Sequence, residues 1–266
     1  MDLGLSGKVV VITGGSSGIG LGVAERMAAE GAEVVICARR EDVLKDAVRQ
    51  VAERTGKTIA GLSIDVTQPA EVDRLRDEVL RLHGRVDILI NNAGTGIYKP
   101  FLDVTEDDLI GGMQLNFFAQ FRVAQRFVPI MQKAQSGSIV NISGCSGLMV
   151  LDPPFLSTCT GPAKAAEIRF TKALAAEVGP FGIRVNCIVP NFVVAPERFE
   201  RWRNSMGGGS RTSSEIQEEW GARITLPGKR WCTIDEIAST ILFVASPASS
   251  YTHGSVIVVD GGYGRD

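Results

Sequence analysis

The stretch TGGSSGIG, residues 13–20, follows a run of Val and Ile and opens an amphipathic segment. A glycine-rich turn between a buried strand and a helix is typical of the first βαβ unit of a dinucleotide-binding sheet. Gly14 permits the tight turn, and Gly18 and Gly20 let the helix pack closely. Because the first N–H groups of a helix are free, this turn predicts a pyrophosphate site. Its predicted contacts are Gly14, Ser16, Ser17, Gly18, Ile19 and Gly20.

Outward from this turn, short apolar runs alternate with longer amphipathic segments. The runs predict strands buried on both faces, and the segments between them predict helices. This alternation is typical of a doubly wound parallel sheet with helices on both sides. We therefore expect one α/β domain over residues 1–266 of Rossmann type. The expected strands are 8–13, 33–38, 58–64, 86–90, 138–143, 183–189 and 255–259, and the clearest helices are 21–31, 70–84, 164–179 and 234–246.

Composition excludes several classes of protein. The 266 residues carry a formal net charge of -2, so no basic surface for nucleic acid is expected. No apolar run reaches the length of a membrane span, and the N-terminus does not resemble a signal peptide, which predicts a cytoplasmic protein. The five cysteines and two histidines lack metal-ligand spacing, so no metal site is expected.

One segment, about 197–229, departs from the regular alternation. Its glycine- and serine-rich stretch MGGGSRTSS, residues 206–214, interrupts two helical patterns. One interpretation is a surface insertion without a function. The other, which we favour, is a lid over a small-molecule substrate, because ligand sites in such sheets lie beyond the carboxyl ends of the strands.

The end of the second strand indicates which dinucleotide binds. A carboxylate there would accept hydrogen bonds from the adenosine ribose, but Ala38 offers none. Arg39 and Arg40 instead offer guanidinium groups that match a 2′-phosphate. The sequence therefore predicts NADP(H) as the cofactor; the alternative is two solvated arginines at a helix start.

An ordered set of motifs resembles the short-chain dehydrogenase/reductase family. They are TGGSSGIG, Asp65 in IDVT, NNAG (91–94), Asn116, Lys164, GIRVNCIVP (182–190) and VDGG (259–262), and they cover nearly the whole chain. The resemblance implies a seven-stranded sheet and a homotetramer or homodimer built across two long helices near 105–134 and 162–179. It also implies cofactor contacts at Asp65, Val66, Asn92, Ala93, Gly94, Lys164, Pro190 and Val193.

Family members use an asparagine, a serine, a tyrosine and a lysine for carbonyl chemistry, and only two are matched here. Asn116 and Lys164 fit. The tyrosine position, four residues before the lysine, is Thr160, and the serine position aligns with Gly144. Strand alternation predicts that Ser143 faces away from the cleft; Ser146 could supply the hydroxyl if the loop shifts.

Other residues near the reacting end also depart from the family. The position after Pro190 is Asn191, and a common threonine is replaced by Ala195. Thr160 cannot replace a phenol as acid and is expected to cap the helix that contains Pro162. Tyr98 should lie at the cleft mouth, as a pocket wall or a proton donor.

Two functions remain open. The first is an NADP(H)-dependent oxidoreductase with a non-standard site, acting on an imine, an enone or another activated acceptor. The second is a non-redox protein on the same scaffold, such as an NADP-binding regulatory subunit or a lyase.

Overall fold

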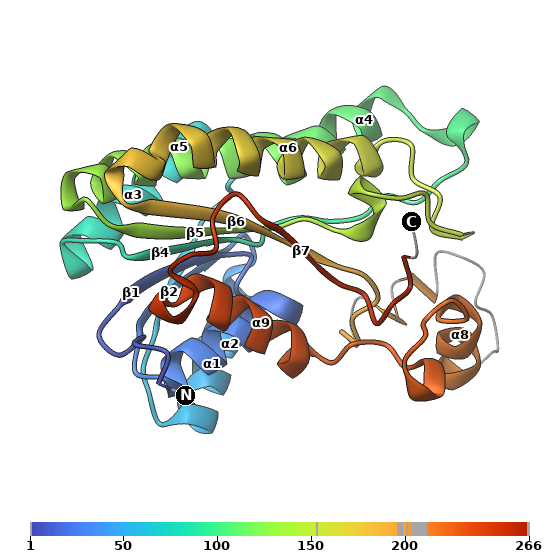
Figure 1. The fold of residues 1–266 in the computed structure, drawn as a ribbon, viewed down its shortest axis with the longest axis horizontal. Helices are drawn as coiled ribbons and strands as arrows, with labels where there is room; N and C mark the ends of the chain where they lie inside the picture. The colour runs from blue at the N-terminus through green and yellow to red at the C-terminus, as the bar shows by residue number, and fades with distance from the viewer. Residues whose placement is uncertain (1, 153, 196–198, 201, 204–211, 265–266) are drawn as a thin grey trace.

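The computed structural model describes residues 2–152, 154–195, 199–200, 202–203 and 212–264. Seven parallel strands form one sheet in the order β3-β2-β1-β4-β5-β6-β7, which confirms the predicted architecture (Figure 1). Each predicted strand is present, with ends that move by up to two residues. The strands are β1 (Val9–Thr13), β2 (Glu33–Ala38), β3 (Ala60–Ser63), β4 (Ile88–Asn91), β5 (Gly137–Ile142), β6 (Ile183–Pro190) and β7 (Val256–Val259).

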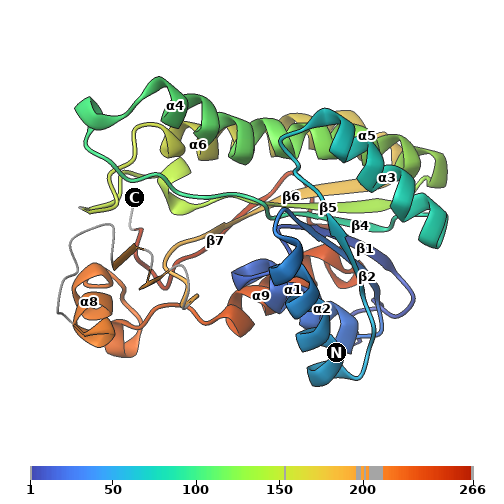
Figure 2. The ribbon, with the colours of Figure 1, turned by 180° about the vertical axis from the view of Figure 1, so that it is seen from behind.

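Helices cover both faces of this sheet (Figure 2). One face packs against α1 (Gly18–Ala29), α2 (Glu41–Thr55) and α9 (Ile234–Ala245), and the other against α3 (Pro69–His83), α5 (Ala119–Ala134) and α6 (Thr160–Val178). The alternation of β1 explains the two layers: Val10 and Ile12 belong to the first core, Val9 and Val11 to the second. Among the described residues, no helix is long and apolar enough to cross a membrane.

The strand order places a crevice beside β1. The chain runs outward from β1 through β2 to β3, then returns to β4 on the other side of β1. Ligands of open α/β sheets bind beyond the carboxyl ends of the strands at such a reversal. The turns that follow β1 and β4 contain the two motifs TGGSSGIG and NNAG.

The long helix predicted near 105–134 contains a break. It consists of α4 (Glu106–Met113), a π-helical turn (Gln114–Phe118) and α5. Thr105 begins α4 with a capping box, in which its hydroxyl accepts from the N–H of Asp108. π-Turns often occur at functional sites, and this one contains Asn116.

The segment predicted as a lid contains α8 (Ser213–Trp220), at the same end of the sheet as the start of α6 (Figure 1). Residues 197–198, 201 and 204–211 of that prediction lie outside the described residues. The described part is not a loose surface insertion, because Phe199, Trp202 and Trp220 are buried. They belong to a third hydrophobic core cluster together with Trp231.

Candidate active site

The turn after β1 is locked by the motif that follows β4. The Thr13 hydroxyl accepts hydrogen bonds from the N–H groups of Asn92 and Ala93, both at 3.0 Å. The Asn92 side chain donates to the carbonyls of Thr13 and Gly14, also at 3.0 Å. A Cβ on Gly20 would lie 2.3 Å from the Gly14 oxygen, so only glycine fits there. The predicted glycine turn is thus a rigid backbone cradle.

The start of α1 fits a phosphate. Ser17 is the N-cap, but its side chain makes no capping hydrogen bond, and the first turn contains no acidic residue. Gly18 adopts a φ of +56°, a left-handed conformation that favours glycine. The free N–H groups and the positive end of the helix dipole therefore remain available to an anion such as a pyrophosphate.

The adenosine end has two exposed arginines. Arg39 and Arg40 follow β2, and neither forms an ion pair with another described residue. Arg39 lines a surface hollow together with Thr67 and Arg122. The Asp65 carboxylate accepts from the N–H and the hydroxyl of Thr67, at 2.9 and 2.7 Å, which fixes the turn after β3. Val66, in the same turn, is buried.

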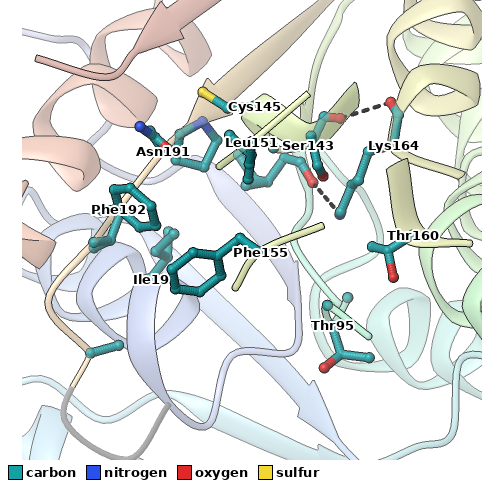
Figure 3. Close-up of a pocket in the computed structure, with 18 of the residues that line it drawn as sticks. Ile19, Thr95, Ser143, Cys145, Leu151, Phe155, Thr160, Lys164, Asn191 and Phe192 are labelled. Atoms are coloured by element: carbon teal, nitrogen blue, oxygen red, sulfur yellow. Dashed lines mark hydrogen bonds between the residues drawn. The ribbon is translucent and has the colours of Figure 1, made fainter. Parts of the chain in front are cut away.

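A pocket lies beyond the ends of β1, β4, β5 and β6, between α1 and α6 (Figure 3). Its lining includes residues of the predicted cofactor motifs, such as Asn92, and residues predicted for the chemistry, such as Lys164. The predicted residues on its wall are Ile19, Asn92, Gly94, Tyr98, Ser143, Gly144, Ser146, Thr160, Lys164, Pro190, Asn191, Val193 and Ala195.

Asn116 is held beside this pocket by the π-turn. It is fully buried, and its amide donates to the carbonyls of Gly112 and Thr95 at 2.9 and 3.1 Å. Its oxygen accepts from the N–H of Thr95 at 3.1 Å. A Cβ on Gly94 would lie 2.7 Å from this oxygen and 3.1 Å from Lys164 Nζ. Asn116, Gly94 and Lys164 therefore meet at one point, as predicted for a common site.

Lys164 forms a buried ion pair that the sequence analysis missed. Its Nζ lies 3.0 Å from Glu167 Oε1 and 3.4 Å from the carbonyl oxygen of Ile142. Glu167 is completely buried, and its Oε2 finds no hydrogen-bond partner among the described residues. Burial raises the pKa of Glu167 to about 7, although Lys164 opposes this shift. The three-residue spacing on a helix was a signal for this pair.

The predicted capping role of Thr160 is wrong. Thr160 is the first residue of α6, and its own N–H donates to the Ser157 hydroxyl at 3.1 Å. The Thr160 hydroxyl instead accepts from the N–H of Ile97 at 2.9 Å and contacts the Ile97 carbonyl at 3.4 Å. The N-cap of α6 is Cys159, whose side chain makes no capping hydrogen bond, so the Ser157 hydroxyl is the side-chain acceptor for the N–H of Thr160.

At the position aligned with the family serine, the pocket is open. A Cβ on Gly144 would meet no atom within 4 Å. Ser143 also lines the pocket, which the alternation argument did not predict. However, the Ser143 hydroxyl donates to the Lys164 carbonyl at 2.8 Å and is thus directed at α6 (Figure 3). Ser146 lines the same pocket.

Aromatic rings form the outer wall. Tyr98 packs edge-on against Phe155 and Trp202, with ring centroids 5.2 and 5.8 Å apart. Phe155 also contacts Phe192 at 5.0 Å. The amide nitrogen of Asn191, on the pocket wall, is buried without a hydrogen-bond partner among the described residues. The site therefore combines an apolar aromatic wall with a polar side that contains Ser143, Thr160 and Lys164.

Comparisons with known proteins agree with this geometry. The profile of a family described as enoyl-(acyl carrier protein) reductase matches residues 14–264. The chain is 36% identical to a peroxisomal 2,4-dienoyl-CoA reductase from Danio rerio, over 97% of this chain and 82% of the relative. It is 35% identical to a 3-oxoacyl-[acyl-carrier-protein] reductase from Chlamydia muridarum, over 97% and 98% of the two chains.

A solved structure shares the whole architecture. L-sorbose reductase from Gluconobacter frateurii, crystallised with NADPH and L-sorbose, has a TM-score of 0.92 and 33% identity over 100% of both chains. All three of these proteins are named as reductases. Their names do not favour the alternative of a non-redox regulatory subunit or lyase. The family match over nearly the full length, on a sheet whose crevice holds the cofactor motifs, places this chain in the short-chain dehydrogenase/reductase family of oxidoreductases.

Proposed function

We propose that the protein is an NADP(H)-dependent reductase of conjugated double bonds, with an enoyl or dienoyl thioester as the substrate class. One observation carries this proposal: the residue one helical turn before Lys164 is a threonine whose hydroxyl is tied to the backbone of Ile97. Among the described residues, the position one helical turn before Lys164 offers no phenol to protonate a carbonyl oxygen. Tyr98, the phenol on the pocket wall, packs edge-on against Phe155 and Trp202. A conjugated thioester is already electrophilic, so alignment with a hydride donor supplies much of the acceleration.

The residues present fit this chemistry. When bound, the nicotinamide cofactor would supply the hydride, and the enolate left on the thioester would take its proton from solvent. Lys164, on the pocket wall, would hold hydroxyl groups of the cofactor, while Asn116 fixes the loop around Gly94. The rings of Phe155 and Phe192 exclude water and bind a flat conjugated chain. The names of the Danio rerio relative and of the matching family support this substrate class.

A substrate panel tests the function. We expect NADPH oxidation, followed by absorbance, with 2,4-dienoyl and 2-enoyl thioesters. Rates with saturated ketones should be at least about 100-fold lower, because the position one helical turn before Lys164 supplies no general acid for a carbonyl oxygen. Imines serve as a second activated acceptor. Ketone reduction at rates equal to those of the conjugated substrates would overturn the proposal.

The cofactor preference is tested at the arginines. We expect Arg39→Ala to weaken NADPH binding by about 10-fold to 100-fold, the value of a charge-assisted contact to a phosphate, and to leave NADH binding unchanged. Fluorescence titration with both cofactors measures this. Lys57→Ala, which removes an exposed cation beyond α2, is the matched control. Equal affinity of the wild type for NADH and NADPH would contradict the role of Arg39.

The segment predicted as a lid contributes to the pocket wall. The lid proposal is supported by Trp202, which lines the pocket from within the segment 197–229.

An apolar surface supports the proposed oligomer. The exposed side chains are Phe118 and Phe121, at 38% and 43%, on the outer side of α5 and the π-helical turn before it. The ring of Phe121 contacts that of Phe170 in α6, with centroids 5.3 Å apart. We propose that this apolar face is covered in a homodimer or homotetramer. The cytoplasmic location stays a prediction.

A further inference from the structure

The buried carboxylate behind Lys164 has no part in the chemistry described so far. Glu167 lies one turn along α6 from Lys164 and is completely shielded from solvent, whereas Lys164 reaches the pocket wall. A glutamate is rarely buried this deeply unless it is paired. Its ion pair with Lys164 uses Oε1, at 3.0 Å, and the neutral Ser143 hydroxyl also interacts with the carboxylate.

Among the described residues, Lys164 is the one charged group that acts on Glu167. The titratable groups that face it are Lys164 from its own helix and the Cys187 thiol from β6. Burial raises the pKa of Cys187 to about 12, so this thiol stays neutral around pH 7. The Thr171 hydroxyl, which donates to the Glu167 carbonyl at 2.9 Å, is neutral as well.

The net charge of the pair therefore depends on one proton. With an ionised Glu167, the pair carries no net charge, and with a protonated Glu167 it carries a full positive charge at the pocket wall. We propose that Glu167 is a positioning residue that sets the charge of the Lys164 site and thereby the preference of the pocket for reduced over oxidised nicotinamide. The inference requires that the pocket bind a nicotinamide cofactor and does not depend on the substrate class.

The direction of the effect follows from electrostatics. Oxidised nicotinamide carries a positive charge and reduced nicotinamide does not, so a positive pair disfavours only the oxidised form. Burial and Lys164 together leave the pKa of Glu167 near 7, so the pair changes charge around neutral pH. Because proton binding and cofactor binding are linked, NADP+ should bind more tightly as the pH rises and Glu167 loses its proton. The ionisation of Glu167 should leave the affinity for uncharged, reduced nicotinamide unchanged.

The test compares both cofactor forms without any substrate. The ratio of the dissociation constants, NADP+ over NADPH, is measured by fluorescence and calorimetry between pH 6 and pH 8. The adenosine phosphates titrate equally in both forms and cancel in the ratio. We expect the wild-type ratio to fall about fivefold across this range, since one pKa unit of coupling gives a tenfold change only between the fully protonated and the fully ionised limits.

Substitutions assign the effect to one residue. Glu167→Gln is neutral at every pH, so its ratio should stay constant at the wild-type value for pH 6. Glu177→Gln, which removes an exposed carboxylate from the same helix, should follow the wild type. Difference infrared spectroscopy should show a protonated carboxyl band at pH 6 that is missing from Glu167→Gln.

Each outcome decides the proposal. A constant ratio in the wild type, or the same pH dependence in Glu167→Gln, would overturn it. If Glu167→Gln does not fold, Glu167→Met, which is also uncharged at every pH, replaces it in both measurements. If only NADH and NAD+ bind, the measurement is repeated with that pair, and only the role of Arg39 fails.

Discussion

Replacing Lys164 with methionine is expected to lower kcat at least about 100-fold and to destabilise the fold most strongly above neutral pH. Under the proposed function, activity should be lost because Lys164 is the group that would orient the cofactor in the pocket, and misplaced reactants lose rate by this order. The stability is lost because Glu167 remains buried without its cation. Breaking a buried pair from one side typically costs about 3–5 kcal/mol.

The pH dependence has a definite sign. Burial raises the pKa of Glu167 from 4.5 to about 7, so the folded wild type holds a proton that the unfolded chain releases. The contribution of Glu167 to the free energy of unfolding of the wild type is therefore complete below about pH 4.5, and it is lost as the pH rises through about 7. Without Lys164 the folded pKa rises further, so the fall continues at higher pH. The stability gap between the two proteins should therefore widen from pH 6 to pH 8.

Chemical unfolding at both pH values measures this gap. The double variant Lys164→Met/Glu167→Gln removes the unpaired carboxylate and should regain stability without regaining activity. Lys172→Met is the control, because Lys172 is an exposed cation on the same helix. A Lys164→Met protein as stable as the wild type at pH 8 would show that Glu167 does not depend on its partner.

The sequence predicted the sheet and the glycine turn after β1 because both depend on local patterns. Each strand is a short, mostly apolar run, and the turn after β1 depends on glycines such as Gly14 and Gly20 that lie within seven residues. Asn116 and Lys164, predicted from single motifs to serve one site, both lie beside Gly94, and their catalytic roles stay predictions. Their meeting at Gly94 could also be expected, since a parallel sheet brings the ends of its strands to one edge.

The reacting end was harder to predict because it depends on tertiary contacts. Thr160 has the residue type of an N-cap, but its hydroxyl is taken by Ile97, which lies 63 positions earlier in the chain. Glu167 occurs in an ordinary amphipathic pattern, and only packing reveals that it is buried. The aromatic wall combines Tyr98, Phe155 and Trp202 from three separate segments, so no single motif contains it.

The double variant Gly144→Ser/Thr160→Tyr is expected to gain ketone reduction by about 100-fold or more over the wild type, the usual contribution of a general acid. A tyrosine at 160 would stand one helical turn before Lys164, where an ammonium group lowers the pKa of a phenol. Thr160 already lines the pocket, so a longer side chain at this position extends into it. A serine at 144 finds open space, since a Cβ there meets nothing within 4 Å.

A matched variant separates acid catalysis from simple filling of the pocket. Gly144→Ser/Thr160→Phe places the same ring without the hydroxyl, and both doubles lose the hydrogen bond from the Ile97 N–H, worth about 1 kcal/mol. NADPH oxidation with a ketone panel, across a pH range, measures the gain. Only the tyrosine variant should gain activity, with a rate that falls as the phenol loses its proton. Equal gain in the phenylalanine variant would show that Thr160 does not occupy the acid position, and the substrate class argued from its bond to Ile97 would fail with it.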